Sequence, residues 1–134
     1  MKRAFVDTSA WFAYVNRADR EHQRIQDAFE AFDGRLLTSN YVLDETVTLC
    51  LYRLGHRAAV TVGNTIRNST SIDLVGVTPD DENNAWSLFE SRGDQNYSFT
   101  DCTSFTLMRR LQVDLALALD EDFANEGFKV LPAG

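Results

Sequence analysis

Short apolar segments alternate with longer segments of helical periodicity along almost the whole chain. The apolar segments are aliphatic or β-branched, and turn-forming residues bound them, which predicts strands over residues 3–6, 35–38, 71–77, 115–119 and 128–131. Between these segments, apolar residues recur three and four positions apart, as on the buried face of a helix. Strands that alternate with helices pair in parallel. The pattern therefore predicts an α/β fold, a three-layer α/β/α sandwich with a mostly parallel central sheet.

The predicted helices have recognisable ends. They include or span residues 11–14, 21–32, 40–54, 57–68, 79–91 and 100–111, and a short turn or helix follows at 120–123. Ser39 or Asn40 caps the third helix, and Thr78 caps the fifth. Gly34 and Gly55 are expected to end the second and third helices.

Burial is predicted from the same periodicity. We expect the helix over residues 40–54 to be well buried and the strand over residues 115–119 to be central, covered on both faces. Four aromatic residues at helical spacings are expected to pack in the core rather than stack on bases: Trp11, Phe12, Trp86 and Phe89. Arg109 and Arg110 are interpreted as a solvated helix face, with contact to a partner or to RNA phosphates as the alternative.

The length and composition favour one ordinary globular domain, residues 1–134, with a hydrophobic core of its own. Two distant cysteines, Cys50 and Cys102, predict neither a disulfide framework nor a cysteine-based zinc site, and favour a reducing, cytoplasmic compartment. The charged Asp7 interrupts any signal-peptide core, and no apolar run approaches the roughly 20 residues of a membrane span. The formal net charge of −7 argues against passive electrostatic adhesion to nucleic acid.

Four acidic residues stand where the predicted fold gathers ligand-binding groups. Asp7 follows the first strand, Asp120 follows the strand over residues 115–119, and Asp101 lies in the first turn of a helix. Ligands of open parallel sheets bind beyond the carboxyl ends of the strands, so these side chains are expected to lie close together. Glu45 lies one turn into an otherwise apolar helix, where a carboxylate is costly unless it is paired or bound to metal.

Carboxylates gathered without basic partners favour a hard divalent cation, because positive charge relieves their repulsion. His22 and His56 lie outside these segments, so the imidazole ligands that zinc commonly uses are missing and Mg²⁺ or Mn²⁺ is predicted. Thr8, Ser9 and Thr100 add hydroxyls that can orient a carboxylate or a water molecule. All-oxygen sites of this kind typically serve phosphoryl chemistry.

Each acidic residue also has a purely structural interpretation. Asp7 and Asp101 can cap helices, and residues 120–122 can form a charged turn. Asp44 and Glu45 can form a solvent-facing acidic pair on an amphipathic helix, in which we favour Glu45 as the inward-facing residue.

The sequence resembles the PIN domain family and, within it, the toxin ribonucleases of type II VapBC toxin–antitoxin pairs. The resemblance covers nearly the whole chain and depends on four segments in a fixed order: 5–11 (FVDTSAW), 41–45 (YVLDE), 98–102 (SFTDC) and 118–123 (ALDEDF). It implies that Asp7, Glu45 and Asp101 bind metal, with a fourth acid from the last segment. Asp120 matches the position directly after the strand and ranks first, whereas Asp122 matches the acid that some members use.

The family resemblance implies a Mg²⁺- or Mn²⁺-dependent endonuclease that cleaves RNA by in-line attack of water and leaves a 5′-phosphate and a 3′-hydroxyl. Asp7, Asp101 and Asp120 would hold the ion, and Glu45 would bind it or help to take a proton from the attacking water. The resemblance also implies a homodimer and a small antitoxin whose basic tail packs against the acids.

Three other functions are weaker alternatives. A solitary PIN nuclease of RNA processing would have much the same sequence, and a non-catalytic PIN-like module would keep the acids to bind a metal or a partner. A haloacid dehalogenase-type phosphatase needs a second acid two residues after Asp7, where Ser9 stands. Inactive PIN domains usually lack one or more of the acids, and all four positions are filled here, so a nuclease is favoured.

Overall fold

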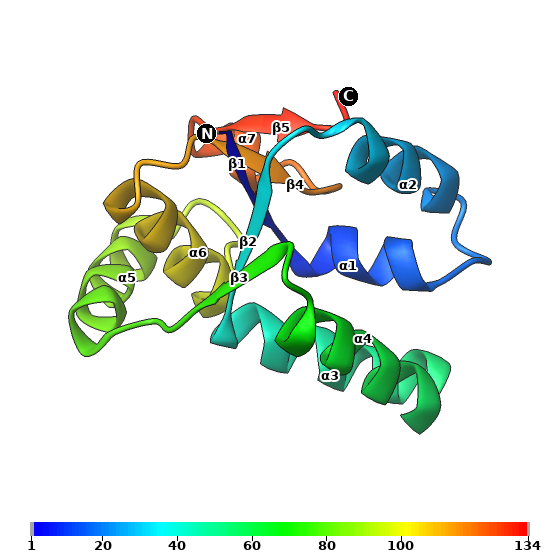
Figure 1. Cartoon of the computed structure of the whole chain (residues 1–134). Helices are drawn as coiled ribbons and strands as arrows, with labels where there is room; N and C mark the ends of the chain where they lie inside the picture. The colour runs from blue at the N-terminus through cyan, green and yellow to red at the C-terminus, as the bar shows by residue number, and fades with distance from the viewer. Residues whose placement is uncertain (1, 134) are drawn as a thin grey trace.

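The structure of the chain, a computed structural model, describes residues 2–133. At its centre lies a five-stranded sheet in the order β3-β2-β1-β4-β5 (Figure 1). The strands are β1 (Arg3–Val6), β2 (Arg35–Ser39), β3 (Ile72–Val75), β4 (Leu115–Leu117) and β5 (Lys129–Leu131). All neighbouring strands pair in parallel, which confirms the predicted mostly parallel sheet.

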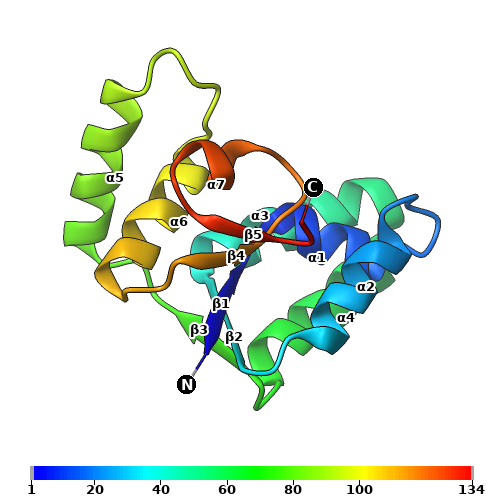
Figure 2. The same ribbon diagram turned by 90° about the horizontal axis from the view of Figure 1, so that it is seen from above.

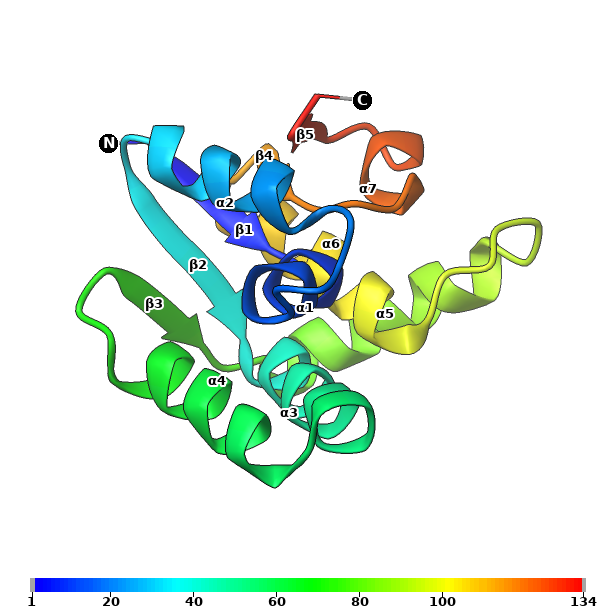
Figure 3. The same ribbon diagram turned by 90° about the vertical axis from the view of Figure 1, so that its right-hand side faces the viewer.

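Helices cover both faces of the sheet, which confirms the predicted three-layer sandwich. On one side lie α1 (Thr8–Val15), α2 (His22–Ala31) and α4 (His56–Asn68), and on the other α5 (Pro79–Ser91), α6 (Phe99–Arg110) and α7 (Asp122–Asn125) (Figure 2). The long α3 (Asn40–Leu54) packs against α1 and α4, as Figure 3 shows, and also against α6. Side chains of α3 therefore lie between helices from the two sides of the sheet.

Side-chain caps determine where several helices begin, as the sequence predicted. Ser39, rather than Asn40, caps α3, and its hydroxyl accepts a hydrogen bond from the Val42 N–H at 3.1 Å. Thr78 caps α5 in a capping box with Asp81, in which each side chain accepts from the backbone N–H of the other. These bonds satisfy N–H groups that have no partner within a helix.

The two glycines that were predicted to end helices have different roles. Gly55 directly follows α3 with a φ of 102°, a conformation that residues with a side chain rarely adopt, and it ends that helix as predicted. The prediction for Gly34 is wrong, because α2 already ends at Ala31. A Cβ atom at Gly34 would lie 2.4 Å from the carbonyl oxygen of Lys2, so glycine here allows two chain segments to pass closely.

The core is built on β1, in which Ala4, Phe5 and Val6 are fully buried. The ring of Phe123, the second residue of α7, lies 6.3 Å from the ring of Phe5 and 4.9 Å from that of Phe105 in α6, measured between centroids. The apolar contacts of Phe123 therefore hold the segment after β4 against the sheet and α6. This anchoring fixes the position of the acidic residues on either side of Phe123.

Two predictions about burial are wrong. Trp11 is buried as predicted, but Trp86 and Phe89 of α5 are 53% and 38% exposed. They are three positions apart and share the outer face of α5, while Ala85 is buried in the core. In α3, Tyr52 is 81% exposed, so that helix is less buried than predicted. Helical spacing identifies a shared face but not what covers it.

Smaller differences concern the strands. β4 ends at Leu117, two residues earlier than predicted, and it is an inner strand beside the central β1. The chain nevertheless stays against the sheet after β4, because the Ala118 N–H donates to the Leu131 carbonyl at 3.1 Å.

Cys50 and Cys102 are both free and buried, which confirms that they form no disulfide. Within residues 2–133, no helix is both long and apolar enough to cross a membrane.

Candidate active site

Asp7 is buried at the point where β1 ends and α1 begins. Its backbone N–H donates to the Leu117 carbonyl of β4 at 3.0 Å, so the residue stands beside the carboxyl ends of two neighbouring strands. Its Oδ2 accepts hydrogen bonds from the Ser9 backbone N–H at 3.2 Å and from the Ser9 hydroxyl at 2.7 Å. Asp7 therefore does cap α1, as the structural interpretation proposed, but a cap alone does not require its burial to 3% exposure.

Ser9 connects the ends of the two strands. Besides donating to Asp7, its hydroxyl accepts a hydrogen bond from the Leu119 N–H at 3.1 Å. Leu119 directly precedes Asp120 in the chain. The hydroxyl of Ser9 thus orients Asp7 and, at the same time, fixes the segment that carries Asp120, which is the supporting role that the sequence suggested for it.

Asp101 approaches the same place from α6. It is the third residue of that helix and forms a capping box with Ser98, in which Ser98 N–H donates to Asp101 Oδ2 and Asp101 N–H donates to Ser98 Oγ, each at 3.0 Å. The side chain is only 9% exposed. As with Asp7, the hydrogen bonds in the cap engage Oδ2, so the other carboxylate oxygen can serve as a ligand.

Glu45 comes from α3. It is half-buried and its charge acts on Asp120, whereas its neighbour Asp44 is exposed, which is the orientation that we favoured from the sequence. Beside it, the hydroxyl of the fully buried Thr46 donates to the hydroxyl of Thr8 at 3.5 Å and connects α3 to α1. Thr46 was not predicted. Its spacing from the buried Val42 would have indicated it, because residues four positions apart share a helix face.

Asp120 and Asp122 both belong to this group. The Asp122 N–H donates to Asp120 Oδ1 at 3.2 Å. Asp120 is the acid with the largest effect on Asp7, whereas Asp122 is the acid with the largest effect on Asp101. The last segment therefore supplies two acids with different neighbours. We refer to Asp7, Glu45, Asp101, Asp120 and Asp122 together as the acidic cluster.

The electrostatics of the acidic cluster are unfavourable in the protein alone. Burial, followed by the charge of Asp120, raises the pKa of Asp7 to about 8. Burial also raises the pKa of Asp101 to about 7, with Asp122 and Asp120 adding to the shift. Asp120 is exposed at its surface, but partial desolvation of its carboxylate, followed by the charges of Asp122 and Glu45, raises its pKa. These groups hold protons at a pH where ordinary aspartates have lost them.

The donor set of the acidic cluster fits a hard divalent cation. It consists of carboxylate oxygens from four parts of the chain. The neighbouring charges that raise the pKa values of these carboxylates come from other acids, and a bound cation would relieve that repulsion. Within residues 2–133, no three acidic, histidine or cysteine side chains already stand close enough to ligate an ion together. An ion would therefore have to draw these repelling side chains closer.

The remaining predicted residue, Thr100, is half-buried in the first turn of α6. Its carbonyl oxygen accepts hydrogen bonds from the hydroxyls of Thr103 and Ser104, at 2.6 and 3.1 Å. These contacts stabilise the start of the helix that carries Asp101. They involve the backbone of Thr100, and among residues 2–133 its hydroxyl makes no hydrogen bond to the acids that would support the role predicted for it.

Comparison with known proteins identifies the family. The family model described as "PIN domain" matches residues 4–129. The chain belongs to the PIN domain family. This PIN domain is 42% identical over 124 residues to a protein of Mycobacterium tuberculosis named "23S rRNA-specific endonuclease VapC20", a match that covers 92% of this chain and 94% of the relative.

Solved structures agree with this assignment. The crystal structure of M. tuberculosis VapC20, which its description calls a "Sarcin-Ricin loop cleaving toxin", matches the PIN domain with a TM-score of 0.90 and 41% identity, over 93% of this chain and 95% of that one. A VapBC structure from Salmonella typhimurium with bound DNA matches with a TM-score of 0.71 and 10% identity, over 97% of both chains. The second likeness concerns the fold alone.

Proposed function

We propose that this PIN domain is a divalent-metal-dependent endoribonuclease and the toxin of a toxin–antitoxin pair. The observation that carries the proposal is the acidic cluster at the carboxyl ends of β1 and β4, where burial and mutual repulsion raise the pKa values of three aspartates. The similarity to VapC20 over almost the full length of both proteins supports the reaction class. The name of that relative makes 23S ribosomal RNA the first substrate to test.

In the proposed reaction, Asp7, Asp101 and Asp120 would hold Mg²⁺ or Mn²⁺. The bound ion would neutralise charge on the phosphate and lower the pKa of a water molecule. Ser9 keeps Asp7 oriented through the 2.7 Å hydrogen bond to Oδ2, and Ser98 keeps Asp101 in place. Asp122 stands beside Asp101 and Asp120 as a further or alternative ligand.

Glu45 takes the proton of the attacking water in this proposal. It stands on α3, a different element from the three proposed ligands, and its charge acts on Asp120. A carboxylate near the ion but outside its immediate ligands is suited to act as a general base. Water would attack the phosphorus in line with the leaving 3′ oxygen, the P–O3′ bond would break, and the leaving oxygen would take a proton from solvent. The products would therefore carry a 5′-phosphate and a 3′-hydroxyl.

The proposed partners are a second copy of the chain and a small antitoxin. An exposed aromatic surface supports the homodimer: Trp86 stacks on Phe89 at 5.6 Å between ring centroids, and Phe99 contacts both, at 6.0 and 6.4 Å. Exposed aromatic groups of this size commonly mark protein interfaces.

The acidic cluster would in turn suit a basic antitoxin segment, because cationic side chains relieve the same repulsion as the metal. The free, buried cysteines fit a cytoplasmic location.

Cleavage of ribosomal RNA tests the proposal directly. Wild-type protein, Asp7→Asn and the matched control Asp44→Asn are incubated with intact ribosomes and with total RNA, in Mg²⁺, in Mn²⁺ and in chelator, and new 5′ ends are mapped. Discrete cuts by wild type and Asp44→Asn that disappear with chelator and with Asp7→Asn are expected. No cuts by folded wild-type protein in either metal would contradict the nuclease and favour the non-catalytic module.

The dimer has its own test. Trp86→Ser is expected to shift the mass measured by light scattering from dimer towards monomer, because it removes the most exposed ring of the aromatic surface. Tyr52→Ser removes an even more exposed ring on α3 and serves as the matched control. Equal masses for wild type and Trp86→Ser would place the interface elsewhere.

A further inference from the structure

A cavity of about 700 Å³ lies between α5 and α6, and three arginines line it. These are Arg92, at the end of α5, and Arg109 and Arg110, at the end of α6. The side chains of Asn84, Ser87 and Thr106 also contribute to its lining. We call this cavity the arginine groove. In a chain with a net charge of −7, it gathers three of the 13 basic residues in one place.

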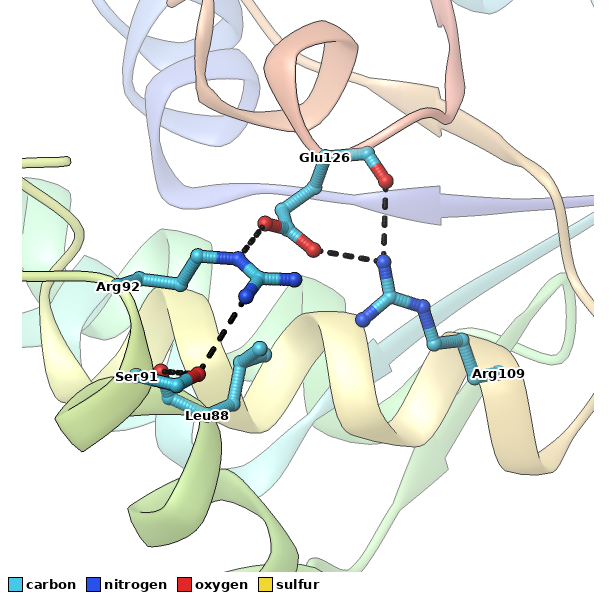
Figure 4. A network of polar contacts seen from close by, with 5 residues as sticks. All are labelled: Leu88, Ser91, Arg92, Arg109 and Glu126. Atoms are coloured by element: carbon cyan, nitrogen blue, oxygen red, sulfur yellow. Dashed lines mark hydrogen bonds and ion pairs between the residues drawn. The ribbon is translucent and has the colours of Figure 1, made fainter. Parts of the chain in front are cut away.

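Buried carboxylates hold these arginines in position. Glu126, whose side chain is 5% exposed, accepts from Arg92 Nε at 2.6 Å and from Arg109 Nη2 at 2.7 Å (Figure 4). Asp81, whose side chain is 2% exposed, pairs with Nε and Nη2 of Arg110, both at 2.8 Å. The guanidinium of Arg109 also lies over the ring of Phe128, 5.1 Å from its centroid. These contacts fix the guanidinium groups before any ligand arrives.

The arginines are far more exposed than their carboxylate partners, although Asp81 also contributes to the lining of the groove. The side chains of Arg92, Arg109 and Arg110 are 39%, 46% and 43% exposed, whereas Glu126 and Asp81 are almost fully covered. Each guanidinium has five N–H donors and makes two hydrogen bonds within residues 2–133, so donors remain for a ligand. The charge of Asp94 also acts on Arg92, so the cationic part of the groove centres on Arg109 and Arg110.

The arginine groove and the acidic cluster share α6 and the segment around α7. α6 carries Asp101 near its start and Arg109 near its end, about 12 Å apart along the helix axis at 1.5 Å per residue. α7 begins at Asp122 and is followed by Glu126. Between the two sites lies Tyr97, whose pKa is raised to about 12 by burial and then by the charges of Glu126 and Asp122. The two sites are therefore neighbours along α6, about 12 Å apart, a distance that one extended ligand can span.

We propose that the arginine groove binds backbone phosphates of the RNA strand on one side of the cleaved bond. This inference depends on the proposed function and adds to it the means by which an acidic protein holds a polyanion. Guanidinium groups form paired hydrogen bonds with phosphate oxygens, and the hydroxyls and amide of the groove can bond to the same oxygens or to ribose. The contact is with the backbone, so it supplies affinity and register and leaves base selection to other residues.

The test compares RNA binding by variants that keep the net charge of the protein. In an Asp7→Asn background, which prevents cleavage, Arg109→Gln is combined with Glu126→Gln, so that no buried carboxylate is left unpaired. The matched control combines Arg24→Gln with Glu21→Gln, an ion pair of 2.9 Å on α2, in the helix layer on the other side of the sheet. The probe is a 23S rRNA fragment, and its Kd is measured from 50 to 300 mM salt.

The groove variant is expected to bind the RNA roughly 10-fold more weakly than its background at low salt, and the slope of log Kd against log salt should fall by about 0.7 to 1. The Arg24/Glu21 control should change neither quantity. Arg109→Lys, which keeps the charge and the pair with Glu126, should retain the slope and lose only part of the affinity. Thermal unfolding of each variant confirms that it is folded.

Two results overturn the inference. If the groove variant and the Arg24/Glu21 control have the same Kd and slope, the arginines only connect helices, and cleavage by wild type would still support the nuclease. If labelled polyglutamate binds the background protein but not the groove variant, while both bind the RNA probe with the same Kd, the groove binds acidic protein segments instead. Absence of both binding and cleavage by the native protein would contradict the proposed function as well.

Discussion

Carboxylates have opposite roles at the two ends of α6. In the acidic cluster, the charges that most affect Asp7, Asp101 and Asp120 come from other acids, and their pKa values are raised. In the arginine groove, burial alone would raise the pKa of Glu126, but hydrogen bonds from Arg92 and Arg109 outweigh it and lower the pKa. The Arg110 hydrogen bond likewise lowers the pKa of Asp81. The carboxylates of the arginine groove are neutralised by partners within the chain, whereas those of the acidic cluster are not.

The difference separates acids that stabilise the fold from those proposed to bind metal. Glu126 and Asp81 are satisfied within the chain and connect α5, α6 and the segment after α7. Asp7 and Asp101 are buried with partners that satisfy one oxygen each but do not neutralise their charge. A fold retains such repulsion where a ligand relieves it. Each of the following four changes affects either the acidic cluster or the arginine groove, and not both.

The largest expected effect is that of Asp7→Asn on RNA cleavage. Loss of one negative ligand should reduce the rate by more than about 100-fold, because even changes to residues that only support metal ligands cost 10- to 100-fold. Asparagine is a good helix cap, so the bond from the Ser9 N–H to residue 7 should survive. The readout is single-turnover cleavage at saturating Mg²⁺, and a loss of less than 10-fold would show that Asp7 is not a ligand.

Glu45→Gln should reduce cleavage by about 10- to 100-fold, as expected for loss of a general base. Asp44→Asn is the control, since it removes the same charge from the neighbouring exposed position of α3, and it should change the rate by less than about twofold. The ratio of the two rates, measured across pH 5.5 to 8.5, reports the role of Glu45. Equal rates for the two variants would exclude Glu45 from the reaction.

Glu126→Ala should lower the free energy of unfolding by about 1–3 kcal/mol, because it leaves two guanidinium groups without their shared partner. Asp7→Asn should act in the opposite direction in metal-free protein at pH 8 and raise it by about 1–3 kcal/mol, since it removes a buried charge. Urea denaturation in chelator measures both. Destabilisation by both variants would contradict the distinction drawn between the two sites.

The smallest effect concerns pH. The pKa of Asp7 is about 8 in the folded chain against an ordinary value of 3.8, so between these values the folded protein holds a proton that the unfolded chain releases. Metal-free wild type should therefore lose stability as the pH rises from 5 to 8, by about 1–2 kcal/mol. Thermal unfolding in chelator at several pH values measures this slope, and Asp7→Asn should flatten it. A stability that rises over this range would contradict the raised pKa.

The sequence predicted much of the fold and the composition of the site. The order of apolar and helical segments is enough to predict a parallel sheet, and acids that directly follow strands are enough to predict a cluster at its carboxyl end. Exposure of Trp86 and Phe89 was not predictable, because their spacing is the same on an inner and an outer helix face. Glu126 gave no local signal either: its two partners lie 34 and 17 positions earlier in the chain.

Two further points required the arrangement of elements in space. The sequence offered Asp120 and Asp122 as alternatives, but the structure places both in the acidic cluster, each with its largest effect on a different buried acid. Gly34 has the composition of a helix terminator but serves a close approach to Lys2, a contact between chain segments that no local pattern encodes. The features that the sequence did not predict thus depend on packing between elements that are distant in sequence.

The most direct test of the account is a calorimetric titration of the metal-free protein with Mn²⁺ at pH 7, in two buffers of different ionisation enthalpy. The comparison of buffers gives the number of protons released on binding. We predict saturable binding to wild type with release of about one proton or more, because Asp7 and Asp101 hold protons until a cation displaces them. We also predict much weaker binding to Asp7→Asn. Binding without proton release, or equal binding to both proteins, would contradict the claim that the acidic cluster is a metal site.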